Sequence, residues 1–186
     1  MIPSLETERM WARPVRLEDA DQVQEIFPQW EIVKHLGAVV PWPYPPDGAL
    51  QFYRDVAIPQ MERAEAWHWT LRLKTAPEKI VGALSLRVAG QEPFETNRGF
   101  WIAPEFQGRG LATEAAEAAN AFWFETLGFP VLQTIKALEN VQSRRVSEKN
   151  GMRVLGIEER DFVCGRLPAE ICEMTAEEWR ARRRVR

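Results

Sequence analysis

Residues 101–113 read Trp-Ile-Ala-Pro-Glu-Phe-Gln-Gly-Arg-Gly-Leu-Ala-Thr, and this stretch decides the fold. An extended apolar start runs through a glycine turn into a segment whose apolar residues recur every three or four positions, which predicts a strand, a turn and a long helix. The first N–H groups of a helix lack partners and carry partial positive charge. Because Gly108, Gly110 and Ala112 are small, a pyrophosphate can approach these groups closely.

Other interpretations of this turn are weaker or less specific. A pair of glycines can simply connect a strand tightly to a helix. A Walker loop is excluded because no Gly-Lys-Ser/Thr follows, and the dinucleotide fingerprint is excluded because Thr113 occupies the place of its third glycine. The turn therefore indicates either a phosphate site of another kind or a plain structural turn.

The length and net charge of the chain limit its domain organisation and its possible function. The chain has 186 residues, of which 45% are hydrophobic, and this predicts a single domain over residues 1–186. A net charge of -3 argues against a general nucleic-acid binder, which needs a broad basic surface. The Arg-rich end, residues 180–186, either suits a helix C-terminus or contacts RNA.

Targeting and metal signals are absent from the sequence pattern. No apolar run approaches the roughly 20 residues that span a bilayer, and the start has no signal-peptide pattern, so we expect a cytoplasmic protein without membrane contact. Cys164 and Cys172 fit neither a zinc knuckle nor a redox pair, and His35 and His68 lack ligand-like neighbours in the sequence. We therefore expect reduced cysteines and no metal.

The hydrophobic pattern predicts alternating strands and helices. Trp67 to Leu73 alternates with a period of two, which indicates a half-buried strand, and an antiparallel meander follows through two more strands. Thr175 to Glu178 has the form of a capping box. The further predicted strands are 9–13, 79–88, 98–103, 130–138 and 152–157, and a last apolar stretch covers 171–174. The predicted helices begin near Leu17, Asp47, Leu111, Val141 and Thr175.

Three motifs now resemble one known family. Gln107 to Ala112 fits the Gln/Arg-x-x-Gly-x-Gly/Ala pattern of the GCN5-related N-acetyltransferases. Glu139-Asn140-Val141-Gln142-Ser143 and Glu148-Lys149-Asn150-Gly151-Met152 resemble the Glu-Asn-x-x-Ser and Glu-Lys-x-Gly-Phe signatures of the ribosomal-protein alanine acetyltransferase (RimJ/RimL-like) branch. The resemblance extends over most of the chain, but only residues 97–152 carry specific motifs.

The resemblance implies a fold and a cofactor. The expected fold is a single α/β (α+β) domain, with a mixed central sheet of about seven strands, flanking helices and two splayed central strands. Acetyl-CoA would supply the acetyl group; its pantetheine arm would extend the sheet beside Phe100, Trp101 and Ile102. The pyrophosphate would lie on the backbone of Gln107, Gly108, Arg109, Gly110, Leu111, Ala112 and Thr113.

The helix after Asn140 supplies the remaining candidates. Asn140 would contact the arm, although it also suits a helix N-cap, and the Ser143 hydroxyl would lie near the thioester sulfur or simply be solvated. Lys149, with Arg144 and Arg145, either attracts the cofactor phosphates or forms a solvated helix face.

Two departures from the family pattern affect the catalytic residues. Relatives often place a tyrosine in this helix as the acid, but the only tyrosines here are Tyr44 and Tyr53, so Ser143 is our candidate donor to the leaving thiolate. Asn97 stands where relatives often use a glutamate base. Glu95, with Glu92 behind it, is the substitute, unless both are plain surface carboxylates or bulk water takes the proton.

The sequence therefore predicts an N-acetyltransferase that moves an acetyl group directly to a primary amine in a ternary complex. The amine would belong to a protein N-terminus or a small molecule, and the protein would act as a monomer or homodimer. The alternative is an acyl-CoA sensor of the same fold with little turnover; RNA association is a third hypothesis. Trp30, Trp42, Trp67 and Trp69 lie where the family builds its acceptor pocket, although core packing explains most of them.

Overall fold

The computed structural model describes residues 2–88 and 96–184. Its strands are β1 (Leu5–Glu6), β2 (Met10–Pro14), β3 (Ala66–Leu73), β4 (Ala76–Arg87), β5 (Arg98–Ile102), β6 (Val131–Ala137), β7 (Arg153–Phe162) and β8 (Gly165–Thr175). Its helices are η1 (Leu17–Asp19), α1 (Ala20–Ile26), α2 (Trp30–Val33), α3 (Gly48–Phe52), η2 (Tyr53–Ala57), α4 (Ile58–Glu62), η3 (Pro104–Phe106), α5 (Leu111–Ala121), η4 (Phe122–Thr126), α6 (Val141–Lys149) and α7 (Ala176–Arg184). The predicted α/β class is confirmed.

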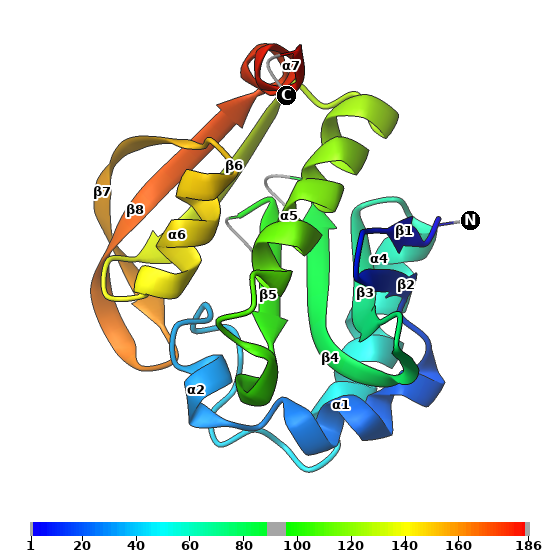
Figure 1. Cartoon of the computed structure of the whole chain (residues 1–186). Helices are drawn as coiled ribbons and strands as arrows, with labels where there is room; N and C mark the ends of the chain where they lie inside the picture. Colours follow the sequence, from blue (N-terminus) through cyan, green and yellow to red (C-terminus); the bar gives the residue numbers. More distant parts are fainter. Residues whose placement is uncertain (1, 89–95, 185–186) are drawn as a thin grey trace.

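The strands form two sheets that diverge from one another. One sheet has the order β1-β2-β3-β4-β5 and the other β6-β8-β7, with antiparallel neighbours throughout. Figure 1 shows β5 and β6 as the strands on either side of the gap, with α5 and α6 in front of it. The expected splay is therefore present, but the expected single mixed sheet is divided into antiparallel sheets of five and three strands.

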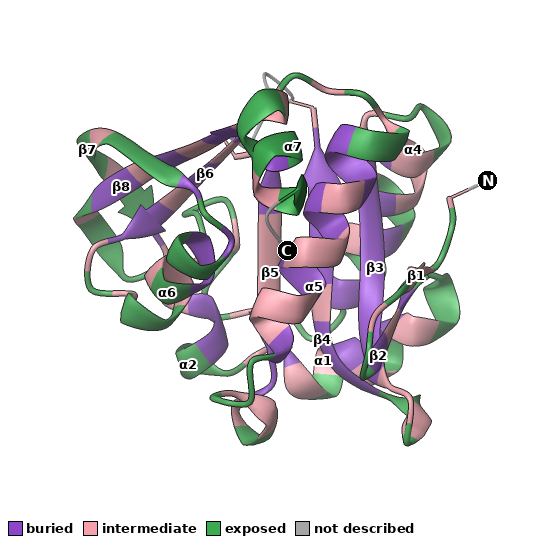
Figure 2. Cartoon of the chain, turned by 45° about the horizontal axis from the view of Figure 1, so that its top comes forward, coloured by how far each residue is buried: buried purple, intermediate pink, exposed green. Residues whose placement is uncertain are grey.

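Helices cover both faces of the larger sheet. On one face, Trp67, Trp69 and Leu71 of β3 pack in the core cluster that contains the apolar side of α5. On the other face, His68 contacts Phe52 and Gln60 of the α3–η2–α4 run. The central strands are consequently buried on both faces (Figure 2). The predicted strand at Trp67 to Leu73 is confirmed, but its predicted half-burial is wrong, because a second layer of helices covers its polar residues.

The helices begin and end close to the predicted positions. The helical run from Gly48 to Glu62 contains a π-helical turn, and it buries Tyr53 and Ala57, whereas Leu50 is exposed. The capping box is present, since the Thr175 amide donates to Glu178 and the Glu178 amide donates to Thr175 Oγ1. In the described residues, no helix has the length and apolar character that a membrane span requires.

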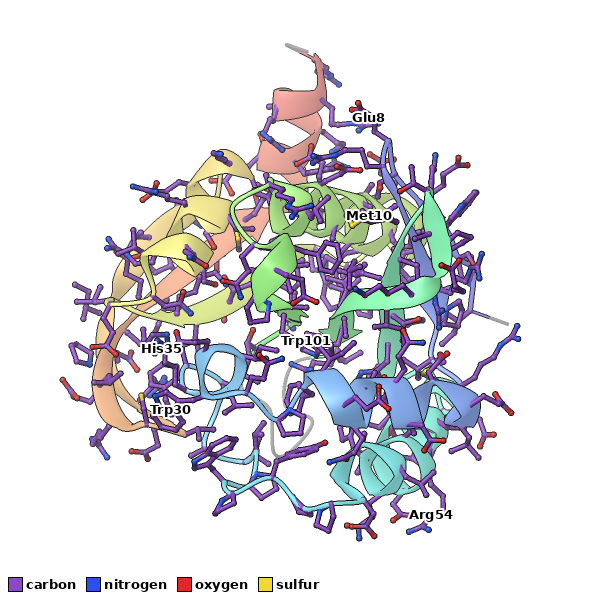
Figure 3. All side chains as sticks on the ribbon, turned by 60° about the horizontal axis from the view of Figure 1, so that its bottom comes forward. Glu8, Met10, Trp30, His35, Arg54 and Trp101 are labelled. Atoms are coloured by element: carbon purple, nitrogen blue, oxygen red, sulfur yellow. The ribbon has the colours of Figure 1, made fainter. Side chains whose placement is uncertain are left out.

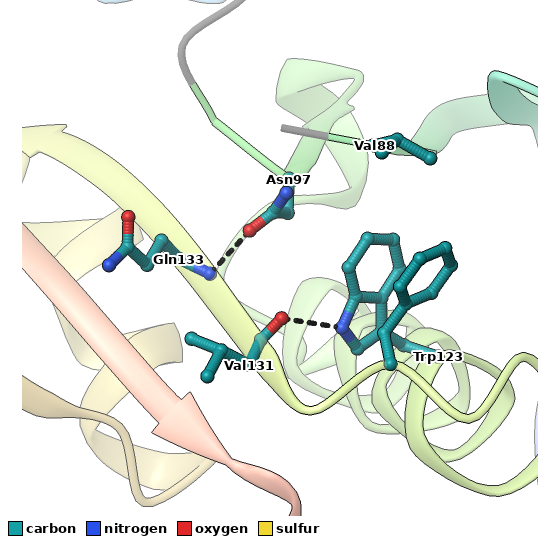
Figure 4. Close-up of a pocket in the computed structure, with 6 residues that line it drawn as sticks. Val88, Asn97, Trp123, Val131 and Gln133 are labelled. Carbon is teal, nitrogen blue, oxygen red and sulfur yellow. Dashed lines mark hydrogen bonds between the residues drawn. The ribbon is translucent and has the colours of Figure 1, made fainter. Parts of the chain in front are cut away.

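Asn97 joins the two sheets at the closed end of the splay. Its main-chain N–H donates to the Gln133 carbonyl (2.9 Å), while its side-chain Oδ1 accepts from the Gln133 N–H (2.7 Å). On the other side, Asn97 Nδ2 donates to the Arg87 carbonyl (3.1 Å). Figure 4 shows this link beside a cavity of about 300 Å³ that Trp123, Phe129 and other side chains line. Asn97 thus fixes the point from which β5 and β6 diverge.

Replacing Asn97 by alanine should destabilise the protein. The change leaves the buried Gln133 N–H and Arg87 carbonyl without their side-chain partner, which costs about 2–3 kcal/mol in the free energy of unfolding. Gln133→Ala is the matched control, because it keeps the main-chain groups of the link. Urea unfolding measures both variants, and a loss for Asn97→Ala no larger than that of the control would contradict this role.

Candidate active site

The turn between β5 and α5 presents free backbone N–H groups. Gly108 (φ 73°) and Gly110 (φ 79°) adopt the left-handed conformation that glycine permits. Helical hydrogen bonding begins only at Glu114, whose N–H donates to the Gly110 carbonyl. Among the described residues, none accepts a hydrogen bond from the N–H groups of residues 108–113. Six successive donors therefore remain available at a helix N-terminus, which is the arrangement of an anion site.

Three side chains hold this turn in shape. Gln107 Nε2 donates to the Ile102 carbonyl (2.9 Å), and Arg109 Nη2 donates to the Glu105 carbonyl (2.7 Å). Arg9 reaches the turn from the N-terminal segment and donates to the Arg109 carbonyl (2.9 Å) while pairing with Glu114. Because these contacts use main-chain carbonyls as acceptors, they leave the N–H groups unoccupied and add two guanidinium groups nearby.

A surface groove of about 560 Å³ adjoins the turn. Gly110 and Thr113 line it together with the exposed side chain of Lys149, so the fold brings this predicted phosphate-attracting lysine to the predicted phosphate turn. The other lining residues are Glu6, Thr7, Glu8, Glu114, Glu117, Ala118, Ala121, Arg182 and Arg183. Its charge is mixed, and Arg182 is already paired with Glu117.

On the edge of β5 that faces the gap, the N–H and C=O of Phe100 have no partner among the described residues, while the Arg98 and Ile102 carbonyls accept from the side chains of Thr96 and Gln107. The Arg87 N–H donates to the Asn97 carbonyl, and the Ala103 N–H donates to the Val81 carbonyl. These two bonds show that the main-chain N–H and C=O groups of the odd-numbered residues of β5 point toward β4. In an antiparallel pair these directions alternate, so the N–H and C=O of Phe100 point into the gap between the sheets. The Trp101 side chain lies on the opposite face against Phe27 (ring centroids 5.5 Å apart), so it cannot line the α5 side of the gap.

The start of α6 has the geometry of an N-cap. Asn140 Oδ1 accepts a hydrogen bond from the Ser143 N–H (3.1 Å), which is the structural role that the sequence left open. This bond uses the side-chain oxygen and leaves Asn140 Nδ2 and the Ser143 hydroxyl without a hydrogen-bond partner among the described residues. Both groups can therefore still serve a ligand.

At the position where relatives often carry a glutamate base, this chain has Asn97. Asn97 is buried and its carboxamide is occupied by main-chain groups, while Glu95 and Glu92 lie outside the described residues. Sequence spacing missed another polar pair, because it is formed by distant segments. His35 Nε2 lies 2.7 Å from Glu139 Oε1, directly before Asn140, and Cys164 lies close to both. The fold thus gives His35 partners of ligating type that its spacing did not suggest.

Two buried cations face the gap between the sheets. In the described part of the chain, Arg98 of β5 hydrogen-bonds to neutral groups, namely the amide oxygens of Asn120 and Asn150 and the sulfur of Met152. Burial lowers the pKa of Arg98, and the nearby Glu117 carboxylate partly offsets this effect. The ammonium of Lys136 on β6 lies 5.4 Å from the centre of the Phe100 ring. Burial, with a smaller contribution from Arg98, lowers the pKa of Lys136 to about 7. The sequence pattern did not single out either residue.

Comparison with known proteins now identifies the chain. A model of the acetyltransferase (GNAT) domain matches residues 9–153. The chain belongs to the GNAT acetyltransferase family. As a GNAT protein it is an N-acetyltransferase that uses acetyl-CoA.

Individual GNAT proteins resemble this chain over most of its length. An uncharacterized N-acetyltransferase, YoaA, of Bacillus subtilis (strain 168) is 22% identical over 157 residues, 84% of this chain and 86% of YoaA. The ribosomal-protein-S5-alanine acetyltransferase of Vibrio fischeri superposes with a TM-score of 0.80 at 17% identity, covering 96% of this chain and 99% of that one. RimL, a ribosomal L7/L12 alpha-N-protein acetyltransferase solved with coenzyme A, gives 0.78 at 13% identity, covering 95% and 99%. The fold is therefore close to that of RimJ/RimL proteins.

A glutamate at position 110 should block the cofactor. Gly110→Glu places a carboxylate among the free N–H groups and should weaken acetyl-CoA binding by roughly tenfold or more in calorimetry, a loss of at least about 1.4 kcal/mol. Gly128→Glu is the matched control, since Gly128 has a similar positive φ of 73° in another loop and open space around it. Equal affinities for the Gly110→Glu and Gly128→Glu proteins would place the phosphates elsewhere.

Proposed function

We propose that the turn over residues 107–113 binds the diphosphate of acetyl-CoA and that the arm continues along the free edge of β5. The single observation that carries this proposal is the run of unpartnered N–H groups at residues 108–113. A diphosphate can accept several of these hydrogen bonds at once, and the start of α5 adds its dipole. The arm's amides match the outward N–H and C=O of Phe100, so the arm would lie beside β5 as an added strand.

The proposed reaction is direct transfer of acetyl to a primary amine. A neutral amine attacks the thioester carbonyl, the new amide bond forms as the carbon–sulfur bond breaks, and coenzyme A leaves as its thiol. Asn140 Nδ2 would hold the arm and the Ser143 hydroxyl would lie near the sulfur, because both groups are unpartnered at the start of α6. Lys149 would attract the cofactor phosphates from the groove that it shares with Gly110.

We further propose a protein N-terminus as the acceptor. Two structural neighbours are named as acetyltransferases of ribosomal-protein alanine or α-amino groups. Trp30 and Trp42 are exposed and packed together (ring centroids 5.5 Å apart), and they would form an apolar rim for the first residues of a peptide. Figure 3 shows Trp30 and His35 together beside α2, and His35 joins this rim to Asn140 through Glu139.

An acyl-CoA sensor of the same fold is the second candidate. It is favoured by Asn97, whose buried carboxamide bridges the sheets and cannot take a proton from the attacking amine. Such a sensor would bind the cofactor through the same turn but release no coenzyme A in the presence of amines.

Turnover separates the two functions. Acetyl-CoA should bind in calorimetry, and free thiol should appear steadily with peptides that begin in Ala or Ser, more slowly with polyamines. Binding without thiol release with any peptide or amine would support the sensor. No binding of acetyl-CoA would contradict the site itself.

Changing Ser143 to alanine should affect the rate more than binding. The variant keeps the main-chain N–H that Asn140 accepts, so α6 should stay capped. We expect kcat to fall about tenfold or more, with the acetyl-CoA dissociation constant within about threefold of the parent. Ser147→Ala, which removes a buried hydroxyl from the same helix, is the matched control for helix stability. An unchanged kcat would remove Ser143 from the mechanism.

A further inference from the structure

Lys136 is a buried amine with no partner that neutralises it. Its side chain is only 6% exposed, and among the described residues no oxygen accepts a hydrogen bond or ion pair from its ammonium. Its cross-strand neighbour Glu170 is already engaged, because Arg144 donates to Glu170 from α6 (2.6 Å). A buried charge without a counter-ion is unfavourable, so a lysine retained in this setting points to an anion that arrives with a ligand.

The surroundings of Lys136 are positive rather than neutral. From β5, Arg98 faces it; among the described residues Arg98 hydrogen-bonds to neutral groups, and the Glu117 carboxylate of α5, which is paired with Arg182, also acts on it electrostatically. From β8, Cys172 and Glu170 face the same region, and burial raises the pKa of Cys172, so that thiol stays protonated. From α6, Arg144 contributes a further positive charge that Glu170 balances. The net field at the Lys136 ammonium therefore favours a negative atom in the gap.

A negative atom attracted by the Lys136 ammonium would lie beside the proposed cofactor arm. Its ammonium lies over the ring of Phe100, and the N–H and C=O of Phe100 point into the gap that the arm would enter. A thioester carried by this arm would develop negative charge on its sulfur as the carbon–sulfur bond breaks. Resting on the proposed function, we propose that the Lys136 ammonium stabilises and protonates the leaving thiolate of coenzyme A.

The proton balance of this step is complete. The amine nitrogen attacks the carbonyl carbon, the carbon–sulfur bond breaks, and its electron pair goes to sulfur, which takes a proton from the Lys136 ammonium. The proton that the acceptor nitrogen loses returns to the neutral Lys136 amine through water. A pKa of about 7 suits this exchange, because the amine can give and regain a proton near neutral pH. Ser143 would then orient the sulfur rather than supply its proton.

The thiol of bound coenzyme A tests this proposal without an acceptor. If Lys136 faces the sulfur, coenzyme A bound to the parent protein should lose its thiol proton at a pH at least one unit below that of free coenzyme A, as thiolate absorbance reports. Lys136→Met, which fills the same space without charge, should abolish that shift. Desulfo-coenzyme A should bind both proteins within about threefold. Lys74→Met, at an exposed lysine paired with Glu6, is the control and should keep the shift.

Each outcome bears on one proposal. A bound thiol that titrates as in free solution, or the same shift in Lys136→Met as in the parent, would overturn the role of Lys136 while leaving the cofactor site intact. Failure of coenzyme A to bind the parent protein would instead contradict the proposed function. Lys136→Arg should retain a lowered thiol pKa but lose turnover, because a guanidinium keeps its charge and does not donate its proton readily.

Discussion

The structure depends on which main-chain groups near the gap between the sheets have hydrogen-bond partners within the protein. Asn97 uses its backbone and its carboxamide to join the two sheets at one end, and beyond it β5 and β6 belong to separate sheets. Their facing edges stay open, and the turn that follows β5 uses its carbonyls, not its N–H groups, to hold its shape. A buried or half-buried main-chain group needs a partner, so these open groups indicate where a polar ligand completes the fold.

The positively charged groups also fall into two sets, one at the turn before α5 and one farther along the gap. The donors at residues 108–113 form a candidate anion site where α5 begins, beside Arg109 and the Arg9–Glu114 ion pair. Farther along the gap lie two buried basic side chains, Arg98 and Lys136, and neither forms an ion pair with a carboxylate among the described residues. The set at the turn suits a diphosphate and the inner pair suits the sulfur of a departing thiolate. One cofactor that is anionic at one end and develops charge at the other would account for both groups.

The sequence predicted the features that depend on local geometry. The glycine turn, the helix over 141–149 and the capping box at Thr175 each follow from neighbouring residues, and the structure has them at those positions. Features that depend on how distant segments pack against one another were not predicted. His68 and Lys136 occupy alternate strand positions that a local pattern assigns to solvent, but packing against distant segments of the fold buries both residues. The partners of His35 come from segments more than a hundred residues away, so no spacing rule could find them.

Amide hydrogen exchange, with and without coenzyme A, tests the central claim most directly. The account predicts that the N–H groups of residues 108–113 exchange rapidly in the free protein, because the fold gives them no acceptor, and become strongly protected when coenzyme A binds. Protection of the Phe100 N–H should increase with them, because the arm would lie against it. If coenzyme A bound while these six groups kept their exchange rates, the diphosphate would lie elsewhere and the account would be contradicted.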